Sequence, residues 1–224
     1  MSMFLPYVTA LLLGSVHALE ADHMAAVTAF AVRRPAPLAA ARFGIRWAIG
    51  HGASVMLAGL VLLLLGFSIP DIANAWLDRL AGAVLIGLGL WTAWHASHLH
   101  AHVQQNQGSL QAQLHSHGQG GGQHNHSHGR DPRHAATMIG ALHGLAGTAP
   151  AVALLQIARQ ESLFEGMSYL AAFAAGTALG MAAYALITGY FMGRAAVASE
   201  RWARALGKFA GLGTIIIGLV WLLR

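Results

Sequence analysis

Long apolar runs separated by short polar or basic links dominate the pattern of this chain. Six of these runs are long enough to cross a bilayer, since about 20 mostly apolar residues span about 30 Å of hydrocarbon. They cover residues 3–29, 43–67, 76–97, 136–158, 164–192 and 203–223. The pattern therefore predicts an all-α membrane protein with six transmembrane helices.

The two halves of the chain resemble each other along this pattern. Two pairs of segments match at an offset of 126 positions and a third pair matches at 129. The matched segments are His17-Ala-Leu with His143-Gly-Leu, Trp47-Ala-Ile-Gly50 with Phe173-Ala-Ala-Gly176, and Arg79-Leu-Ala-Gly82 with Lys208-Phe-Ala-Gly211. Three helices per half is an odd number, so the second half must enter the membrane in the opposite sense. We expect two inverted three-helix repeats, residues 1–97 and 136–224, an arrangement that recurs in transporters.

Composition and charge agree with a membrane chain. Of the 224 residues, 56% are hydrophobic and only 9% are charged, whereas soluble domains carry about 25% charged residues. Ten of the 13 Lys and Arg residues lie in the links after the first, third and fifth runs. The positive-inside rule makes those links cytoplasmic and both termini external. Arginines in pairs between apolar runs indicate lipid headgroups, so we expect no nucleic-acid partner.

Histidine is the unusual residue of this sequence, with 14 copies. Nine of them lie in residues 98–134, a stretch rich in Gly, Gln and His that cannot pack a core. We expect residues 98–135 to form a mobile cytoplasmic loop between the repeats. Its His-x-His spacings allow weak, exchangeable sites for Ni²⁺, Co²⁺ or Zn²⁺, in an accessory role. A polar linker with no part in transport is the alternative.

A second group of histidines lies inside the predicted helices, beside acidic residues. Ionisable groups in a membrane helix cost a few kcal/mol each and usually mark an ion or substrate path. At a rise of about 1.5 Å per residue, His23, His51 and His143 lie at similar distances from the cytoplasmic ends of their three helices. These histidines and the acidic residues beside them could therefore converge in one layer of the membrane. These candidate metal-site residues are His17, Glu20, Asp22 and His23 in the first helix, His51 in the second and His143 in the fourth.

Helix geometry separates Asp22 from its neighbours. At about 100° per residue, His17, Glu20 and His23 form one stripe, whereas Asp22 falls about 140° from His17. Either the first helix is distorted, or Asp22 has a different role, such as orienting a ligating imidazole. Imidazole and carboxylate ligands without sulfur suit nickel, cobalt, zinc or manganese. With no cysteine in the chain, thiolate sites and thiol nucleophiles are excluded.

The fourth run also contains a helix breaker and a hydroxyl. Pro150 is expected to kink or break the helix. At the offset of 126, Thr148 aligns with Asp22 and Thr177 aligns with His51. Their hydroxyls are expected either to line the same path or to bond back to their own helices.

Three of these segments resemble those of the nickel/cobalt transporters of the NiCoT and UreH-like type. The segments are HALEADH at 17–23, Gly50-His51, and LHGLAGTAP at 142–150. The resemblance implies that His17, Asp22 and His23 correspond to the family's H-x4-D-H motif. The chain departs from many uptake members by having Glu20 in place of Asp and by having fewer helices. Its His-rich loop is more similar to that of efflux members.

We therefore expect a secondary transporter of Ni²⁺, with Co²⁺ as a second cargo, in a bacterial inner membrane. The chain has no nucleotide-binding motif, and we expect neither enzymatic activity nor a tightly bound cofactor. Its partners are the metal ion and the bilayer, and a homo-oligomer is left open. Uptake is preferred, with efflux as the alternative. A haem protein with His17, His51 or His143 as axial ligands is an alternative of another class. An intramembrane zinc hydrolase is disfavoured because HExxH is absent.

Overall fold

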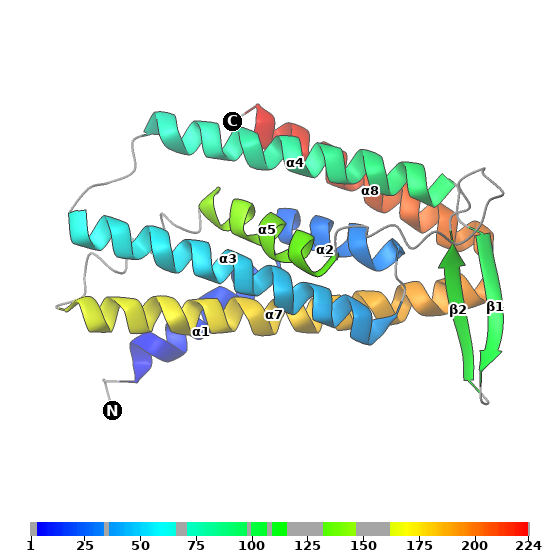
Figure 1. Ribbon diagram of the computed structural model, residues 1–224, viewed down its shortest axis with the longest axis horizontal. Helices are drawn as coiled ribbons and strands as arrows, with labels where there is room; N and C mark the ends of the chain where they lie inside the picture. Colours follow the sequence, from blue (N-terminus) through cyan, green and yellow to red (C-terminus); the bar gives the residue numbers. More distant parts are fainter. Residues whose placement is uncertain are drawn as a thin grey trace.

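A computed structural model describes residues 4–33, 36–65, 71–97, 100–106, 109–115, 132–146 and 162–223. It is a bundle of α-helices with a two-stranded hairpin at one end (Figure 1). The helices are α1 (Leu5–His17), α2 (Ala21–Arg33), α3 (Pro37–Leu65), α4 (Asp71–Ser97), α5 (Pro132–Leu145), α7 (Leu163–Ala198) and α8 (Glu200–Leu222). The strands are β1 (His100–Asn106) and β2 (Ser109–His115).

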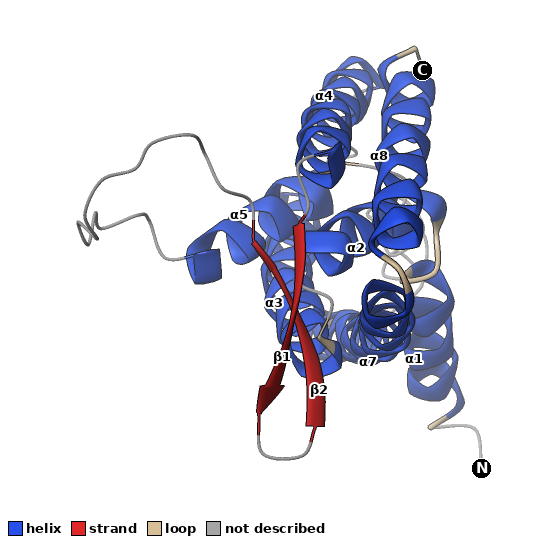
Figure 2. Ribbon diagram, turned by 90° about the vertical axis from the view of Figure 1, so that its right-hand side faces the viewer, coloured by secondary structure: helices blue, strands red, loops and turns tan. Residues whose placement is uncertain are grey.

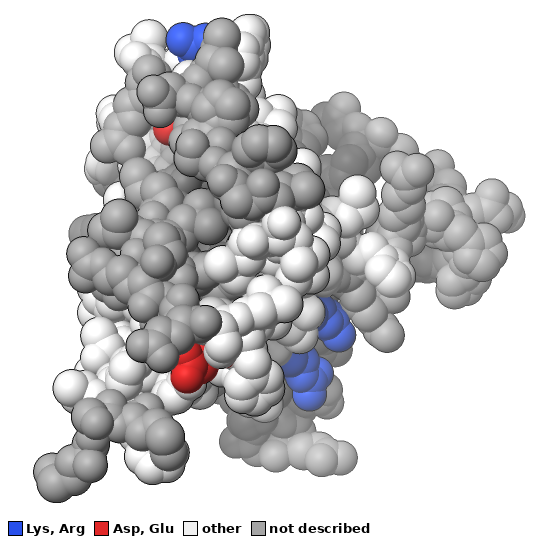
Figure 3. All heavy atoms as spheres, turned by 90° about the vertical axis from the view of Figure 1, so that its left-hand side faces the viewer, with Lys and Arg blue, Asp and Glu red and all other residues white. Residues whose placement is uncertain are grey.

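The helices present an apolar surface that suits a bilayer. Within the described residues, three helical segments are long and apolar enough to cross a membrane: Ala75–Ser97, Leu163–Ala198 and Glu200–Leu222. Large apolar side chains face outward, among them Phe164 at 79% and Phe209 at 72% exposure. Figure 3 looks onto the end of the bundle where α7 begins, and few charged groups are seen there among the described residues. The chain is therefore a helical membrane protein.

The first apolar run does not form one helix, so the prediction of a single span over residues 3–29 is wrong. Helix α1 ends at His17 and α2 starts at Ala21. Between them the N–H of Glu20 donates to the carbonyl of His17 at 3.0 Å, a tight turn of the 3₁₀ kind. The acidic Asp22 then occupies the first turn of α2, where the helix dipole favours a negative charge. The polar residues around Asp22 thus allow a new helix, α2, to begin in the middle of an apolar run.

Closely packed helix pairs, among them α1 with α7 and α3 with α5, meet at glycines. In the end-on view of Figure 2, α4 and α8 lie side by side at one edge, and α2 and α5 lie between them and α1, α3 and α7. A Cβ on Gly14 of α1 would collide with the carbonyl of Phe173 in α7. A Cβ on Gly140 of α5 would likewise collide with the carbonyl of Trp47 in α3. Small residues of this kind let membrane helices approach closely.

The α4–α8 pair crosses through glycines in the same way. Gly82 lies against the backbone of Gly218, and Gly89 lies against the backbone of Gly211. These two contacts exchange places when each residue is shifted by the offset of 129 positions. Helices α4 and α8 run antiparallel, while α3 runs with α5 and α1 runs with α7 (Figure 1).

The segment expected to be an irregular loop contains the hairpin. The strands β1 and β2 pair antiparallel, with His100 opposite His115 and Val103 opposite Ala112. The expectation is therefore wrong for residues 100–106 and 109–115. It depended on composition alone and overlooked runs that contain no proline and no glycine. The sequence predictions about Thr148 and Pro150 fall outside the described residues.

Candidate metal centre

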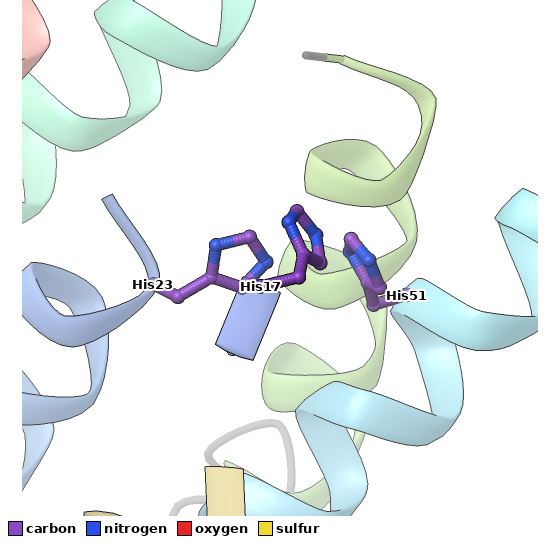
Figure 4. Close-up of side chains that lie close together, drawn as sticks. All are labelled: His17, His23 and His51. Atoms are coloured by element: carbon purple, nitrogen blue, oxygen red, sulfur yellow. The ribbon is translucent and has the colours of Figure 1, made fainter. Parts of the chain in front are cut away.

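Three imidazoles meet at the centre of the bundle, each from a different helix. His17 is the last residue of α1, His23 lies in the first turns of α2, and His51 lies midway along α3. Their rings converge in Figure 4, with centroids 4.5 Å apart for His17 and His23 and 5.1 Å apart for His23 and His51. All three are buried, at 7%, 1% and 2% exposure. One ligand atom from each lies within 4.8 Å of those of the other two.

The break between α1 and α2 makes this convergence possible. In an unbroken helix, His17 and His23 would project about 120° apart and about 9 Å apart along the axis. The turn at Glu20 instead brings the two rings edge to face at 4.5 Å. Both alternatives raised by the sequence are observed, because the helix is broken here and Asp22 also contacts the imidazole of His23 at 3.0 Å.

Several buried nitrogens of these three rings have no hydrogen-bond partner. They are Nε2 of His17, Nε2 of His23, and both Nδ1 and Nε2 of His51. Leaving a buried polar atom unsatisfied costs about 1–3 kcal/mol, so such atoms are rare in folded proteins. A cation bound by one nitrogen of each ring would give all three rings a partner.

Carboxylates hold the opposite nitrogens of two of these rings. The Nδ1 of His17 lies 2.9 Å from a carboxylate oxygen of Glu20, and the Nδ1 of His23 lies 3.0 Å from one of Asp22. When Nδ1 carries the proton and donates to the carboxylate, the lone pair of Nε2 is free to bind a metal. A carboxylate behind the imidazole is the usual support of a metal-ligating histidine. The two carboxylates differ in burial, because the side chain of Asp22 is 3% exposed and that of Glu20 is 45% exposed.

His143 joins the cluster through Asp22. Its Nε2 lies 2.8 Å from the second carboxylate oxygen of Asp22, and its ring centroid lies 4.7 Å from that of His23. Asp22, His23 and His143 form a second group with ligand atoms within 4.8 Å, which shares His23 with the first. The fold thus gathers all of the residues that the sequence singled out, with Glu20 at the exposed rim.

Two aromatic residues enclose the cluster, and sequence reasoning assigned no site role to either. The indole of Trp47 stacks on His23 with centroids 5.7 Å apart, and it lies 5.5 Å from His143. The ring of Phe173 lies 5.4 Å from that of His17. The sequence did contain the signal, since Trp47 and Phe173 are the first residues of the matched segments. The hydroxyl of Thr177, one turn further along α7, donates to the carbonyl of Phe173 at 3.0 Å.

This arrangement suits a divalent transition-metal ion. Three neutral imidazoles supply nitrogen ligands, and the carboxylates of Glu20 and Asp22, when ionised, match the charge of a divalent cation. Nitrogen ligands at about 2.0–2.1 Å from a tetrahedral ion lie about 3.4 Å from one another. The ligand atoms here lie within 4.8 Å of one another, so they need to approach by at most about 1.4 Å to bind such an ion.

Comparisons with known proteins agree with a membrane protein of this type. The chain is 29% identical to the urease accessory protein UreH of Bacillus sp. (strain TB-90) over 177 residues, which cover 79% of this chain and 73% of that protein. This match confirms the resemblance to UreH-like proteins. No solved structure shows significant similarity to the chain. Residues 7–220 match the family described as the cytochrome c biogenesis protein transmembrane region. Because this match spans nearly the whole chain, the protein belongs to that family.

Proposed function

We propose that this protein is a secondary transporter that moves Ni²⁺, with Co²⁺ as a second cargo, through the site formed by His17, His23 and His51. The observation that carries the proposal is the set of buried imidazole rings with unpartnered nitrogens, one ligand atom of each lying within 4.8 Å of those of the other two. A structural role would have given these nitrogens protein partners. A cation bound by one nitrogen of each ring is the simplest group that gives all three rings a partner.

The ligand chemistry supports the choice of cargo. Imidazole nitrogens with nearby carboxylates favour borderline ions such as nickel and cobalt, whereas Cu⁺ prefers sulfur ligands. The chain has no cysteine. The resemblance to nickel/cobalt transporters implies the same cargo, and the match to a UreH protein supports that branch.

The packing supports movement of two inverted repeats about the site. The contact of Gly14 with Phe173 and the contact of Gly140 with Trp47 exchange places under the offset of 126 positions. The proposed site takes His17, His23 and His51 from the first half. The second half reaches it through His143, whose Nε2 lies 2.8 Å from a carboxylate oxygen of Asp22. A site between two inverted repeats is where rocking of one repeat against the other alternates access.

Orientation and direction are also part of the proposal. The C-terminal ends of α2, α4 and α7 point to the same end of the bundle (Figure 1), which is the arrangement that the basic links require. We place that end in the cytoplasm of a bacterium, with both termini external, by the positive-inside rule. The HALEADH segment resembles uptake and UreH-like members, whereas the His-rich loop resembles efflux members. Uptake is preferred because HALEADH is the more specific of these two motifs, and efflux is the alternative direction.

The description of the family raises a role in cytochrome c biogenesis, and the residues of this chain argue against two forms of it. A dithiol relay needs cysteine, and the sequence has none. Haem ligation needs an open plane between two axial histidines. Here His23 packs edge to face against both His17 and His51, which leaves no such plane.

Metal flux and metal binding together test the proposal. Purified protein in liposomes is expected to carry ⁶³Ni²⁺ down an imposed gradient, and His17→Ala or His23→Ala is expected to abolish both flux and binding. The matched control is His134→Ala, an exposed histidine in the first turn of α5. Unchanged flux in the two site variants would contradict the site. Flux that is absent from the unaltered protein would contradict the function.

A further inference from the structure

One aromatic ring packs against each of two histidines of the cluster. Trp47 is fully buried and stacks on His23 at an interplanar angle of 23°. Phe173 is 4% exposed and covers His17 at an interplanar angle of 33°. A hydrated cation cannot pass a packed ring, so each of these side chains must move before an ion can reach the imidazoles from its side.

The two rings occupy equivalent places in the two halves. They are separated by the same 126 positions as His17 and His143. Trp47 lies one turn before His51 on α3, and Phe173 lies one turn before Thr177 on α7. The carbonyl of each abuts a glycine of the partner helix, in matching positions.

The rings lie on opposite sides of the histidines along the long axis of the bundle. Helices α3 and α7 lie side by side and run antiparallel (Figure 1). Trp47 precedes His51 on α3 and therefore lies toward the end where α3 begins. The α7 residue next to Phe173, Ala174, meets Gly52 of α3, so Phe173 is about level with His51. Because side chains in helices lean toward the helix start, the Phe173 ring lies toward the end where α7 begins.

Further aromatic residues pack against Trp47 and Phe173 on the sides away from the histidines. Phe43 lies 6.2 Å from Trp47, and Phe30 of α2 stacks on Phe43 at 3.8 Å with an interplanar angle of 8°. On the other side, Tyr169 packs with Phe173 and Ala10 of α1. Tyr169 is 126 positions from Phe43, the same separation as that between Trp47 and Phe173. The outer aromatic residues therefore occupy equivalent sequence positions in the two halves, as the inner ones do.

One feature of Trp47 favours a movable ring. Its indole Nε1 is buried and has no hydrogen-bond partner. An unsatisfied indole N–H penalises the closed position, and any displacement toward water or a carbonyl relieves the penalty. The stacking on His23 holds the ring in place against this penalty. The unsatisfied indole N–H therefore destabilises the observed position of the Trp47 ring, while stacking on His23 stabilises it. A ring with these opposing contributions can move at a small cost in free energy.

We propose that Trp47 and Phe173 are the two gates of the metal site, one on each side of the membrane, which open in alternation. This inference deepens the transport function proposed above and depends on it. Removing the Trp47 ring opens the site toward the end where α3 begins, the cytoplasmic end by the placement of the basic links. Removing the Phe173 ring opens it toward the opposite end.

Cysteine labelling tests the gates without using the metal. The chain has no cysteine, so a single Thr177→Cys substitution on the fully buried position one turn from Phe173 serves as the reporter. A charged, membrane-impermeant maleimide is applied to vesicles of each orientation. The reporter alone is expected to label slowly from both sides. Adding Trp47→Ala is expected to raise labelling from the cytoplasmic side by about ten-fold or more, because loss of a large buried ring leaves a cavity of its size.

Adding Phe173→Ala instead is expected to raise labelling from the external side by a similar factor. Trp47→Phe and Phe173→Tyr, which keep a ring, are the matched controls and are expected to label slowly. If an alanine variant does not give a monodisperse protein, Trp47→Leu and Phe173→Leu replace it. Labelling that increases from the same side in both variants, or in neither, would overturn the inference. Absence of nickel flux in unaltered protein would instead refute the transport function while leaving the sided labelling intact.

Discussion

The two halves of the molecule share their packing but differ in their chemistry. Gly14 of the first half meets the carbonyl of Phe173, and Gly140 of the second half meets the carbonyl of Trp47 in the equivalent way. At the level of the cluster, however, the first half places His51 where the second half places Thr177. The acidic residues of the cluster, Glu20 and Asp22, also belong to the first half.

The difference teaches that the scaffold and the site obey separate requirements. Close packing of membrane helices needs small residues at each crossing, and this need is the same in both halves. An ion at the interface between the halves needs only one set of ligands, so ligands on one half suffice. The second half contributes His143, which is held by Asp22 of the first half at 2.8 Å.

The largest expected effect separates His51 from its counterpart. His51→Ala is expected to lower nickel affinity by more than about 100-fold, beyond the 10–100-fold effect of removing a residue that only supports a ligand. Thr177→Val is expected to retain nickel binding, because the hydroxyl of Thr177 is bonded to its own helix. Calorimetric titration of both variants with Ni²⁺ measures the contrast. Equal losses would show that the chemistry is shared by the two halves.

The next effect separates the two carboxylates. Asp22→Asn is expected to lower nickel affinity by about 10–100-fold, because it weakens the support of His23 and leaves His143 without its charged partner. Glu20→Gln is expected to cost less than about ten-fold, since Glu20 is half exposed and supports only His17. Competition with a nickel-binding dye gives both affinities. A larger loss for Glu20→Gln would reverse the proposed roles.

The shared packing predicts matched losses of stability in the two halves. Gly14→Ala and Gly140→Ala are each expected to destabilise the fold by on the order of 1–3 kcal/mol, because the new Cβ meets a backbone carbonyl. Gly87→Ala and Gly213→Ala are the controls, since a Cβ there meets nothing within 4 Å. They are expected to be neutral or stabilising by up to about 1 kcal/mol. Thermal unfolding in detergent compares the four variants, and a loss at only one of the two crossing glycines would break the correspondence.

The smallest expected effect concerns two serines that bridge the same helix pairs. The Ser54 hydroxyl donates to the Ala141 carbonyl at 2.8 Å, and the Ser15 hydroxyl donates to the Gly176 carbonyl at 3.2 Å. Each serine also bonds to its own helix, so Ser54→Ala and Ser15→Ala are each expected to cost about 0.6 kcal/mol, the average for such bonds in membranes. Unfolding of the two variants in denaturing detergent provides the measurement. A cost above about 2 kcal/mol for either would indicate a role in the site.

Much of the site could be predicted from the sequence because buried charge is so costly in a membrane. Histidines and acids inside apolar runs have few explanations other than a polar site, so His17, Asp22, His23 and His51 could be selected without coordinates. The helical nature of the bundle followed from the same apolar runs. The hairpin over 100–115 was missed because composition does not specify strand pairing.

The sequence by itself determined the apolar character of the helices, the side chains that are candidate ligands and the absence of cysteine. Only the tertiary structure decided that the first run breaks after His17, because a helix break depends on competing local hydrogen bonds that an apolar pattern does not reveal. That break turns His23 toward His17 and Asp22 toward His143. The contacts of Trp47 with His23 and of Phe173 with His17 were likewise decided in three dimensions, because no sequence pattern tells which ring packs on which imidazole.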